Sequence, residues 1–179
     1  MKATVITGSR ADWNGLGMVA KCLRRDFAVD VNVLAIGQHA DSEESLTTVI
    51  TDGFDPRLAR TNFRDEMAIG CGTATLIVQG MLQDERPDVV LLCGDRFEIL
   101  GAASAAAMLR IPIAHIGGGD ITEGSIDNRL RYAISALSDL HFVTNQKAFD
   151  RLTERGHSNV HLFGNPALDR ILEWQNAVQ

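Results

Sequence analysis

Apolar residues in this chain form short runs that alternate with longer amphipathic stretches. The clearest run is Val89-Val90-Leu91-Leu92-Cys93, five apolar residues that predict a buried parallel strand. Gly94-Asp95-Arg96 follows it, and then an Ala-rich helical stretch from Ile99 to Leu109. Ligands of open α/β folds bind at the carboxyl ends of the strands, so this junction is a candidate for binding chemistry.

The same alternation of strand and helix patterns continues along the chain. Strands are predicted at 3–7, 29–36, 88–93, 112–116, 140–144 and 160–163, with a further edge strand within 57–63. Helices are predicted at 42–50, 65–85, 96–110, 125–138, 146–155 and 168–176, after a first helix that reaches about residue 25 with Asp12 or Asn14 as its N-cap. Right-handed crossovers then give a parallel sheet covered on both faces. We therefore expect one α/β domain over residues 1–179, a Rossmann-like three-layer sandwich, with a linker-like segment near 163–179.

Composition narrows the class of protein. Of 179 residues, 45% are hydrophobic and 22% are charged, which is typical of a soluble globular domain. The net charge is -6 and no basic cluster is present, so we expect no nucleic-acid partner. No apolar run is long enough for a membrane span, and no secretory signal is recognised. Three widely spaced cysteines favour buried reduced thiols and a cytoplasmic location.

Three polar loops are expected on one edge of the sheet. They span 8–12, 94–98 and 117–127, and each follows a predicted strand and has Gly before a helix start. Gly lets the backbone approach a ligand closely, and a helix N-terminus favours an anion, so a phosphate-bearing small molecule fits. Gly8 begins neither the dinucleotide motif nor the Walker motif. Gly15-Leu16-Gly17 is followed by Ala20, where the dinucleotide motif has its third glycine. A standard NAD or ATP site is therefore disfavoured.

Two pairs of residues in these loops have both a structural and a functional interpretation. Asp95 and Glu98 have the spacing of a capping box, which would satisfy backbone donors, but Asp95 could equally be a general acid or base. Asp127 and Arg131 lie four residues apart, as in an ordinary ion pair on a helix, or they face the Gly-rich loop as a functional pair. Spacing alone does not separate these interpretations.

Two further residues stand at strand ends. Arg10 follows the first strand, where it is either a surface arginine or an anion ligand. His115 ends a strand with no metal-ligand partner at a recognisable spacing, which favours a buried core histidine, and no metal site is predicted.

Taken together, five motifs in order resemble the hydrolysing UDP-N-acetylglucosamine 2-epimerases, specifically the branch that serves sialic-acid-type sugars. Each motif is weak alone, but the series covers about residues 3–169. The motifs are Gly8-Ser9-Arg10-Ala11-Asp12, Gly94-Asp95-Arg96-x-Glu98, His115-Ile116-x-Gly118-Gly119-Asp120, Ile126-Asp127 with Arg131, and Gly164-x-Pro166-x-x-Asp169.

The resemblance implies the N-terminal half of a glycosyltransferase-B-like two-domain fold, with no counterpart here of the second domain. It implies that UDP leaves UDP-N-acetylglucosamine by anti elimination across C1 and C2, through 2-acetamidoglucal, and that water then adds to give N-acetylmannosamine. It implies no cofactor and a homodimer. Because half of the cleft is missing, we expect the fragment alone to be inactive.

The resemblance also assigns residues. It implies catalytic roles for Asp95 and Asp127. It implies substrate binding by the remaining motif residues, which are Arg10, Asp12, Arg96, Glu98, His115, Gly118, Gly119 and Arg131. Gly117 departs from the family, because many relatives have a catalytic Glu there, so either Asp120 or Glu123 substitutes for it or the sugar specificity differs. The alternative is a non-catalytic nucleotide-sugar-binding domain on the same fold.

Overall fold

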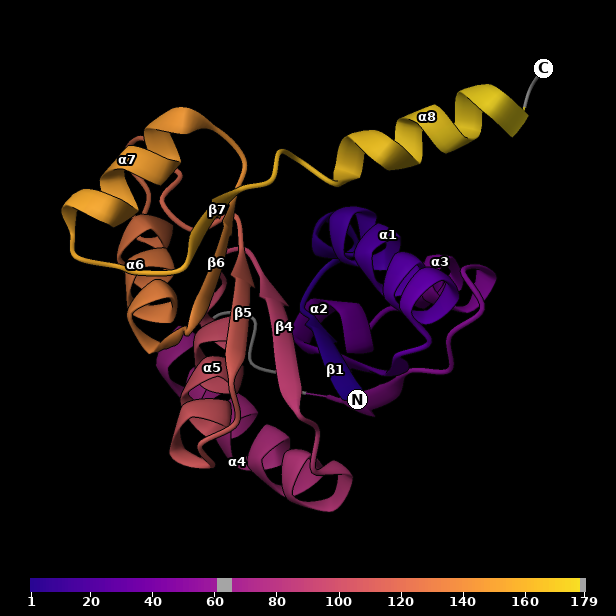
Figure 1. The fold of residues 1–179 in the computed structure, drawn as a ribbon. Coiled ribbons are helices and arrows are strands. Elements are labelled where there is room, and N and C mark those ends of the chain that lie inside the picture. Colours follow the sequence, from indigo (N-terminus) through magenta and orange to yellow (C-terminus); the bar gives the residue numbers. More distant parts are fainter. Residues whose placement is uncertain (61–65, 178–179) are drawn as a thin grey trace.

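A seven-stranded parallel sheet forms the centre of the molecule (Figure 1). The computed structural model describes residues 1–60 and 66–177. The strand order is β3-β2-β1-β4-β5-β6-β7, and every neighbouring pair is parallel. The strands are β1 (Lys2–Thr7), β2 (Asp30–Ile36), β3 (Arg57–Ala59), β4 (Val89–Cys93), β5 (Ile113–Ile116), β6 (Leu140–Val143) and β7 (Val160–Leu162).

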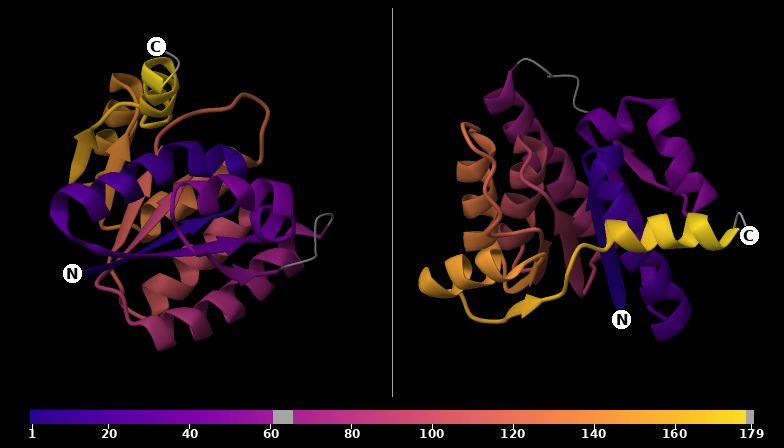
Figure 2. Two further views of the ribbon diagram at one scale, coloured as in Figure 1. Left: turned by 90° about the vertical axis from the view of Figure 1, so that its right-hand side faces the viewer. Right: turned by 90° about the horizontal axis from the view of Figure 1, so that it is seen from above.

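Helices cover both faces of this sheet, so the predicted three layers are confirmed (Figure 2). They are α1 (Arg10–Phe27), α2 (Gly37–Ala40), α3 (Glu43–Thr51), α4 (Met67–Glu85), α5 (Phe97–Met108), α6 (Asp127–Leu137), α7 (Gln146–Glu154) and α8 (Ala167–Ala177). The short α2 was not predicted. Residues 61–63 of the predicted 57–63 strand lie outside the described residues.

The larger core lies between the sheet and helices α4, α5 and α6. Alanines of α5, among them Ala102 and Ala106, are fully buried there against Ile6 and Leu92 of the central strands. Small side chains bring α5 close to the sheet, which fixes the Gly94-Asp95-Arg96 loop at its carboxyl edge. The apolar run at residues 89–93 is therefore a central buried strand, as predicted.

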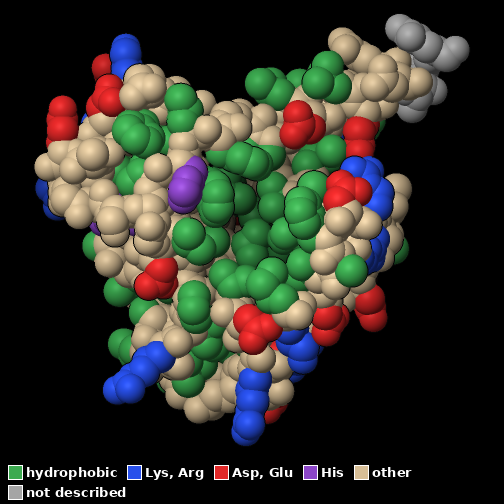
Figure 3. Space-filling view, viewed as in Figure 1, with side chains coloured by type: hydrophobic (Ala, Val, Ile, Leu, Met, Phe, Trp, Pro, Cys, Tyr) green, Lys and Arg blue, Asp and Glu red, His purple; other side chains and the backbone are tan. Residues whose placement is uncertain are grey.

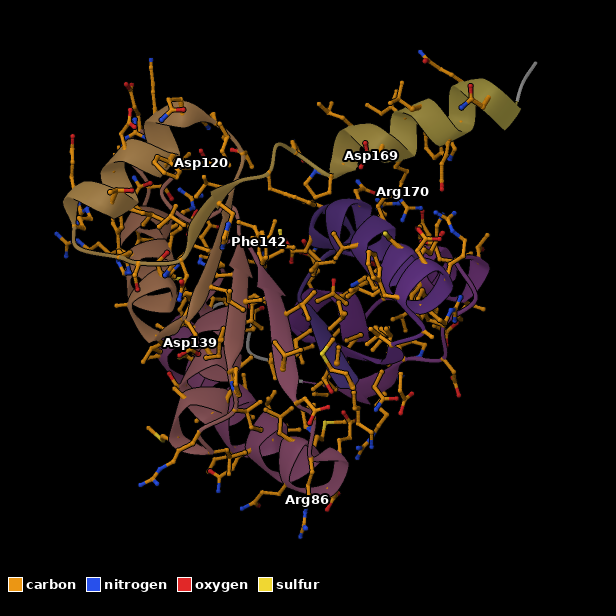
Figure 4. All side chains as sticks on the ribbon, in the orientation of Figure 1. Arg86, Asp120, Asp139, Phe142, Asp169 and Arg170 are labelled. Carbon is orange, nitrogen blue, oxygen red and sulfur yellow. The ribbon has the colours of Figure 1, made fainter. Side chains whose placement is uncertain are left out.

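The opposite face of the sheet is only partly covered. Trp13, Leu16 and Ala20 of α1 pack over it, but an apolar hollow of about 480 Å³ remains between α1 and the segment that joins β7 to α8. Figure 3 shows this hollow as a hydrophobic patch in the middle of the molecule, and Phe142 of β6 points into it (Figure 4).

Two local expectations need correction. The first helix begins at Arg10, and its N-cap is Ser9, whose hydroxyl accepts from the Asp12 amide, so neither Asp12 nor Asn14 is the cap. The three cysteines are free, as predicted, but each is partly exposed rather than buried. Within the described residues, no helix is long and apolar enough to cross a membrane.

Candidate functional site

The three predicted polar loops meet at one edge of the sheet, because β1, β4 and β5 are direct neighbours and parallel. Asp12 connects the first loop with the second. Its Oδ2 accepts from the Gly8 amide, within the first loop, at 3.2 Å. Its Oδ1 lies 3.2 Å from the position that a Cβ would take at Gly94. The second and third loops are joined by Arg131.

Arg131 is the side chain around which the site is assembled. It is 7% exposed, and its Nη2 donates to Asp95 Oδ2 across the two loops. Its Nη1 donates to the Asp120 carbonyl at 2.6 Å and to Asn128 Oδ1 at 3.2 Å. Arg131 therefore holds Asp95 and the third loop together, and the predicted ion pair between Asp127 and Arg131 is not the one that forms.

Asp95 lies among other charges that change its proton affinity. Burial raises the pKa of Asp95, and the Asp127 carboxylate adds to this, while Arg131 and Arg96 oppose it and leave the pKa raised overall. Asp127 itself accepts from the Ser125 hydroxyl at 2.6 Å. The predicted catalytic acids Asp95 and Asp127 are thus close enough to interact electrostatically.

Arg96 and Glu98 pair with each other in a bidentate arrangement. Nε and Nη2 of Arg96 donate to the two Glu98 oxygens at 3.2 and 3.0 Å. Glu98 is 3% exposed, so its carboxylate is fixed in the interior. The N-cap of α5 is Arg96, without a side-chain cap, so the capping box of Asp95 and Glu98 does not exist.

Asp12 is the carboxylate at this edge whose pKa is shifted furthest towards neutrality. Burial raises the pKa of Asp12 to about 6, although hydrogen bonds from Ser9 and Gly8 and the charge of Arg96 act against the shift. A carboxyl group with a pKa in this range can exchange protons near neutral pH. The resemblance assigned Asp12 only to substrate binding.

His115 lies beneath the site and not on its surface. It is fully buried, and both ring nitrogens bind protein atoms, Nε2 the Gly94 carbonyl at 2.9 Å and Nδ1 the Ser135 hydroxyl at 3.1 Å. A carbonyl only accepts, so Nε2 carries the proton and Nδ1 accepts from Ser135. Burial lowers the pKa of His115 to about 4. The core interpretation is therefore correct, and a direct substrate contact by its side chain is not.

Gly118 and Gly119 serve the packing of the third loop. Both are buried, and a Cβ at Gly119 would lie 2.5 Å from the Ala148 carbonyl, while one at Gly118 would lie 2.8 Å from Ser135 Oγ. With φ of +78°, Gly119 also has a backbone conformation that disfavours any side chain. Their small size is explained by contacts inside the protein, where substrate binding had been predicted.

The Asp120 side chain is engaged with the next loop along the sheet. Its two oxygens accept from Thr144 Oγ1 at 3.0 Å and from Asn145 Nδ2 at 2.8 Å. Figure 4 shows Asp120 near α6 and α7, apart from α1. These contacts favour a role in holding the loop over the predicted catalytic role.

Arg10 faces a neighbouring hollow and not the Asp95 cluster. Its guanidinium lies 3.7 Å from Glu44, and its side chain is 62% exposed. The hollow has a volume of about 300 Å³ and is lined by polar residues of the α1 start and of the α2–α3 segment, including Gln38 and Ser45. Arg10 is thus free to turn towards an anion at the same sheet edge.

Sequence reasoning missed several residues that support the site, namely Ser135, Thr144, Asn145 and Arg151, which donates to the Gly119 carbonyl at 2.9 Å. Only Asn145 had a sequence signal, as an N-cap residue before a helix. Within the described ranges, no group of three His, Cys, Asp or Glu side chains is arranged to hold a metal.

Solved structures resemble the fold over nearly the whole chain. The crystal structure of UDP-GlcNAc 2-epimerase from Neisseria meningitidis bound to UDP-GlcNAc superposes with a TM-score of 0.88 at 22% identity, and covers 99% of this chain and 50% of that one. The Methanocaldococcus jannaschii enzyme gives 0.86 at 22% identity, over 97% and 49%. The predicted fold, the N-terminal half of a glycosyltransferase-B-like protein, is confirmed.

Sequence comparisons agree with the fold. The chain is 33% identical to the Legionella pneumophila UDP-N,N'-diacetylbacillosamine 2-epimerase (hydrolyzing), over 99% of this chain and 49% of the relative. It is 28% identical to the UDP-N-acetylglucosamine 2-epimerase of Neisseria meningitidis, over 92% and 45%. The chain therefore spans about half the length of the curated relatives it matches. Residues 21–179 match the family described as UDP-N-acetylglucosamine 2-epimerase, and the chain belongs to that family.

Proposed function

We propose that this chain forms one wall of the active site of a hydrolysing nucleotide-sugar 2-epimerase. The observation that carries the proposal is the Asp95–Arg131 pair at the carboxyl edge of the sheet, with the Asp127 and Asp12 carboxylates around it. Removal of a proton from a sugar C2 needs a base, and the departing UDP and the incoming water need an acid. The raised pKa of Asp95 suits such proton exchange.

In this proposal Asp95 and Asp127 exchange protons with the sugar, and Arg131 orients Asp95. The base takes the C2 proton while the C1–O bond to UDP breaks, which leaves the 2-acetamidoglucal. Water then adds across the double bond, with its oxygen at C1 and a proton at C2 on the opposite face. Arg10 and Arg96 provide positive charge for the diphosphate, and Asp120 holds the third loop.

The substrate is proposed to be a UDP-linked 2-acetamido sugar. The relatives named above act, by their names, on UDP-N-acetylglucosamine or on UDP-N,N'-diacetylbacillosamine, and another relative from Escherichia coli is described as a polysialic acid biosynthesis protein. These names support a product of the N-acetylmannosamine type for sialic-acid-like sugars. The free cysteines fit the reducing cytoplasm, and a cytoplasmic location stays a prediction.

The test uses a protein in which this chain is joined to the second half that its relatives have. With UDP-N-acetylglucosamine it is expected to release UDP and N-acetylmannosamine, and Asp95→Asn to slow turnover by roughly 10²–10⁴-fold. Asp150→Asn, which changes an exposed Asp of α7, is the matched control and leaves the rate unchanged. An unchanged rate in Asp95→Asn contradicts the assignment. The 179-residue chain alone is expected to show no turnover.

A second candidate function is a non-catalytic nucleotide-sugar-binding domain. Gly117 favours it, because this position carries no side chain and faces open space, whereas the family resemblance implies a catalytic Glu there. This function predicts that the joined protein binds UDP-N-acetylglucosamine but never forms the glycal. Detection of N-acetylmannosamine excludes it.

We also propose that the chain forms a homodimer. The outer face of α4 supports this, since no charged residue occurs from Met67 to Gln83, and Ile69 and Leu76 are 50% and 74% exposed. Surface helices normally have a polar outer face. Light scattering of the 179-residue chain is expected to give twice the monomer mass. The Leu76→Glu variant is expected to give the mass of the monomer.

A further inference from the structure

Helix α8 crosses α1 at two glycines, Gly15 and Gly17. A Cβ at Gly17 would lie 2.6 Å from Nη2 of Arg170 and 2.8 Å from the Trp13 ring. A Cβ at Gly15 would lie 3.1 Å from Cγ of Pro166, just before α8. Glycine weakens a helix interior, so two glycines at one crossing indicate that the close approach matters. The Gly15-Leu16-Gly17 motif is thus a notch for α8.

A buried ion pair closes this notch. Arg170 of α8 is 7% exposed, and its Nη2 and Nη1 lie 2.6 and 3.3 Å from the two oxygens of Asp52, at the end of α3. Its Nε donates to the Asn14 carbonyl of α1 at 3.3 Å. Figure 4 shows Arg170 directed from α8 towards α1. One guanidinium therefore ties three helices together.

Further donors surround the Asp52 carboxylate. Nε1 of Trp13 donates to Oδ2 at 2.8 Å, and Lys21 lies 3.6 Å from Oδ1. Lys21 also pairs with Glu173 of α8 at 2.6 Å. We call Asp52, Arg170, Trp13 and Lys21 the α8 clamp. Segments near a chain end are usually poorly ordered unless contacts hold them in place. The α8 clamp provides such contacts for α8.

The location of the α8 clamp in the chain indicates its function. This chain corresponds to the N-terminal half of its family, and α8 is its last element, so in the relatives' arrangement the second half follows α8. We propose that Asp52 and Arg170 are positioning residues, which fix α8 in the notch of α1 and thereby fix where the second half meets the Asp95 site. The part that concerns the second half rests on the proposed function.

The first experiment measures amide hydrogen exchange in the full 179-residue chain. Arg170→Met and Asp52→Asn are expected to speed the exchange of α8 by roughly tenfold or more, because each leaves a buried charge or its hydrogen bonds unpaired. Arg57→Met, which breaks the pair with Glu85 far from α8, is the matched control and leaves α8 exchange unchanged. Unchanged exchange in Arg170→Met overturns the clamp.

A pair of glycine variants tests the notch separately. Gly17→Ala is expected to loosen α8 in the same exchange measurement, although alanine favours the helix itself. Gly80→Ala in α4 is the control, since a Cβ there meets nothing within 4 Å. If Gly17→Ala protects α8 as well as the wild type does, the notch interpretation is wrong.

The last experiment uses the protein joined to its second half. Arg170→Met is expected to lower kcat by roughly tenfold to a hundredfold, because the catalytic groups are then misplaced relative to the second half. The circular dichroism spectrum should be unchanged, and Arg170→Lys should restore part of the activity. Loosened α8 with full turnover overturns the positioning role and leaves the epimerase proposal intact. A wild-type protein without turnover overturns the epimerase proposal instead, and the exchange experiments still decide the clamp.

Discussion

Within the described residues, two enclosed Arg–Asp pairs differ in their surroundings. At the sheet edge, Arg131 holds Asp95, and further carboxylates lie nearby. At the α8 clamp, Arg170 holds Asp52, and further donors lie nearby. Both arginines are 7% exposed, and both also bind a backbone carbonyl.

The two aspartates respond in opposite ways. Burial would raise the pKa of both, and for Asp95 it does, with Asp127 adding to the shift. For Asp52 the hydrogen bonds and charge of Arg170, with Trp13 and Lys21, outweigh burial and lower the pKa. An excess of acids thus prepares one pair for proton exchange, and an excess of donors makes the other a fixed ion pair. The neighbours of a pair, more than the pair itself, indicate its role.

The largest effect is expected from removing each arginine. Arg131→Met and Arg170→Met should each lower the free energy of unfolding by about 3–5 kcal/mol near neutral pH, because a partner charge is left buried. The pKa of Asp95 is raised even with Arg131 present, so Asp95 can relieve its loss by taking a proton, and the Arg131→Met penalty should shrink more than that of Arg170→Met when the pH is lowered from neutral to mildly acidic. Urea unfolding at both pH values measures this. Equal pH dependence in the two variants would contradict the comparison.

A smaller effect is expected from the histidine beneath the sheet edge. The pKa of His115 is lowered to about 4 by burial, so the unfolded chain takes up its proton first and stability is lost as the pH falls from about 6.5 towards 4. The loss from His115 should be about 2–3 kcal/mol. His115→Asn should remove this part of the pH dependence in urea unfolding. Because the pKa of His141 is also lowered to about 4, His141→Asn should reduce the same pH dependence further.

The contribution of Asp12 to stability should change with pH in the direction opposite to that of His115. Its pKa of about 6 means that the folded protein holds the proton more tightly, so stability falls as the pH rises from about 4 to about 6. Asp12→Asn should remove this loss and gain about 2 kcal/mol relative to the wild type across that interval. The same urea experiment decides it, and a constant difference between the two proteins would show that Asp12 has an ordinary pKa.

The smallest effect concerns the rim of the clamp. Lys21 is 24% exposed, and its charge is partly in water. Lys21→Met should cost about 0.5–1 kcal/mol, well below Arg170→Met. A loss as large as that of Arg170→Met would mean that Lys21, and not Arg170, holds Asp52. Thermal unfolding of the two variants side by side is sufficient.

Much of the fold could be predicted from the sequence, because apolar runs and Gly-containing loops repeat regularly. The junction after residues 89–93 was correctly placed at the carboxyl edge of a central strand. The meeting of the three loops followed from parallel strand direction alone. The family motifs then named Asp95 and Arg131 without showing that they pair.

The pairing itself could not be predicted, because local spacing favours neighbours. Arg131 was matched with Asp127, four residues away, but it binds Asp95, 36 residues away. Asp52 and Arg170 are separated by 118 residues and share no motif. Only the fold brings such residues together, and the same limit hid Ser135 beneath His115.

The clamp also has a consequence for the order in which the chain acquires its structure during synthesis. The first strand pairs on one side with β2, where Lys2 lies opposite Asp30, and on the other with β4, where Ala3 lies opposite Val89, 86 residues later. Arg170 of the α8 clamp makes a contact over a longer separation, because it binds the carbonyl of Asn14, 156 positions earlier. The ribosome releases the chain from its N-terminus, so Asp95 and Arg131 are both available before Arg170 is made. A partly synthesised chain would therefore contain both members of the Asp95–Arg131 pair before it contains the arginine that completes the α8 clamp.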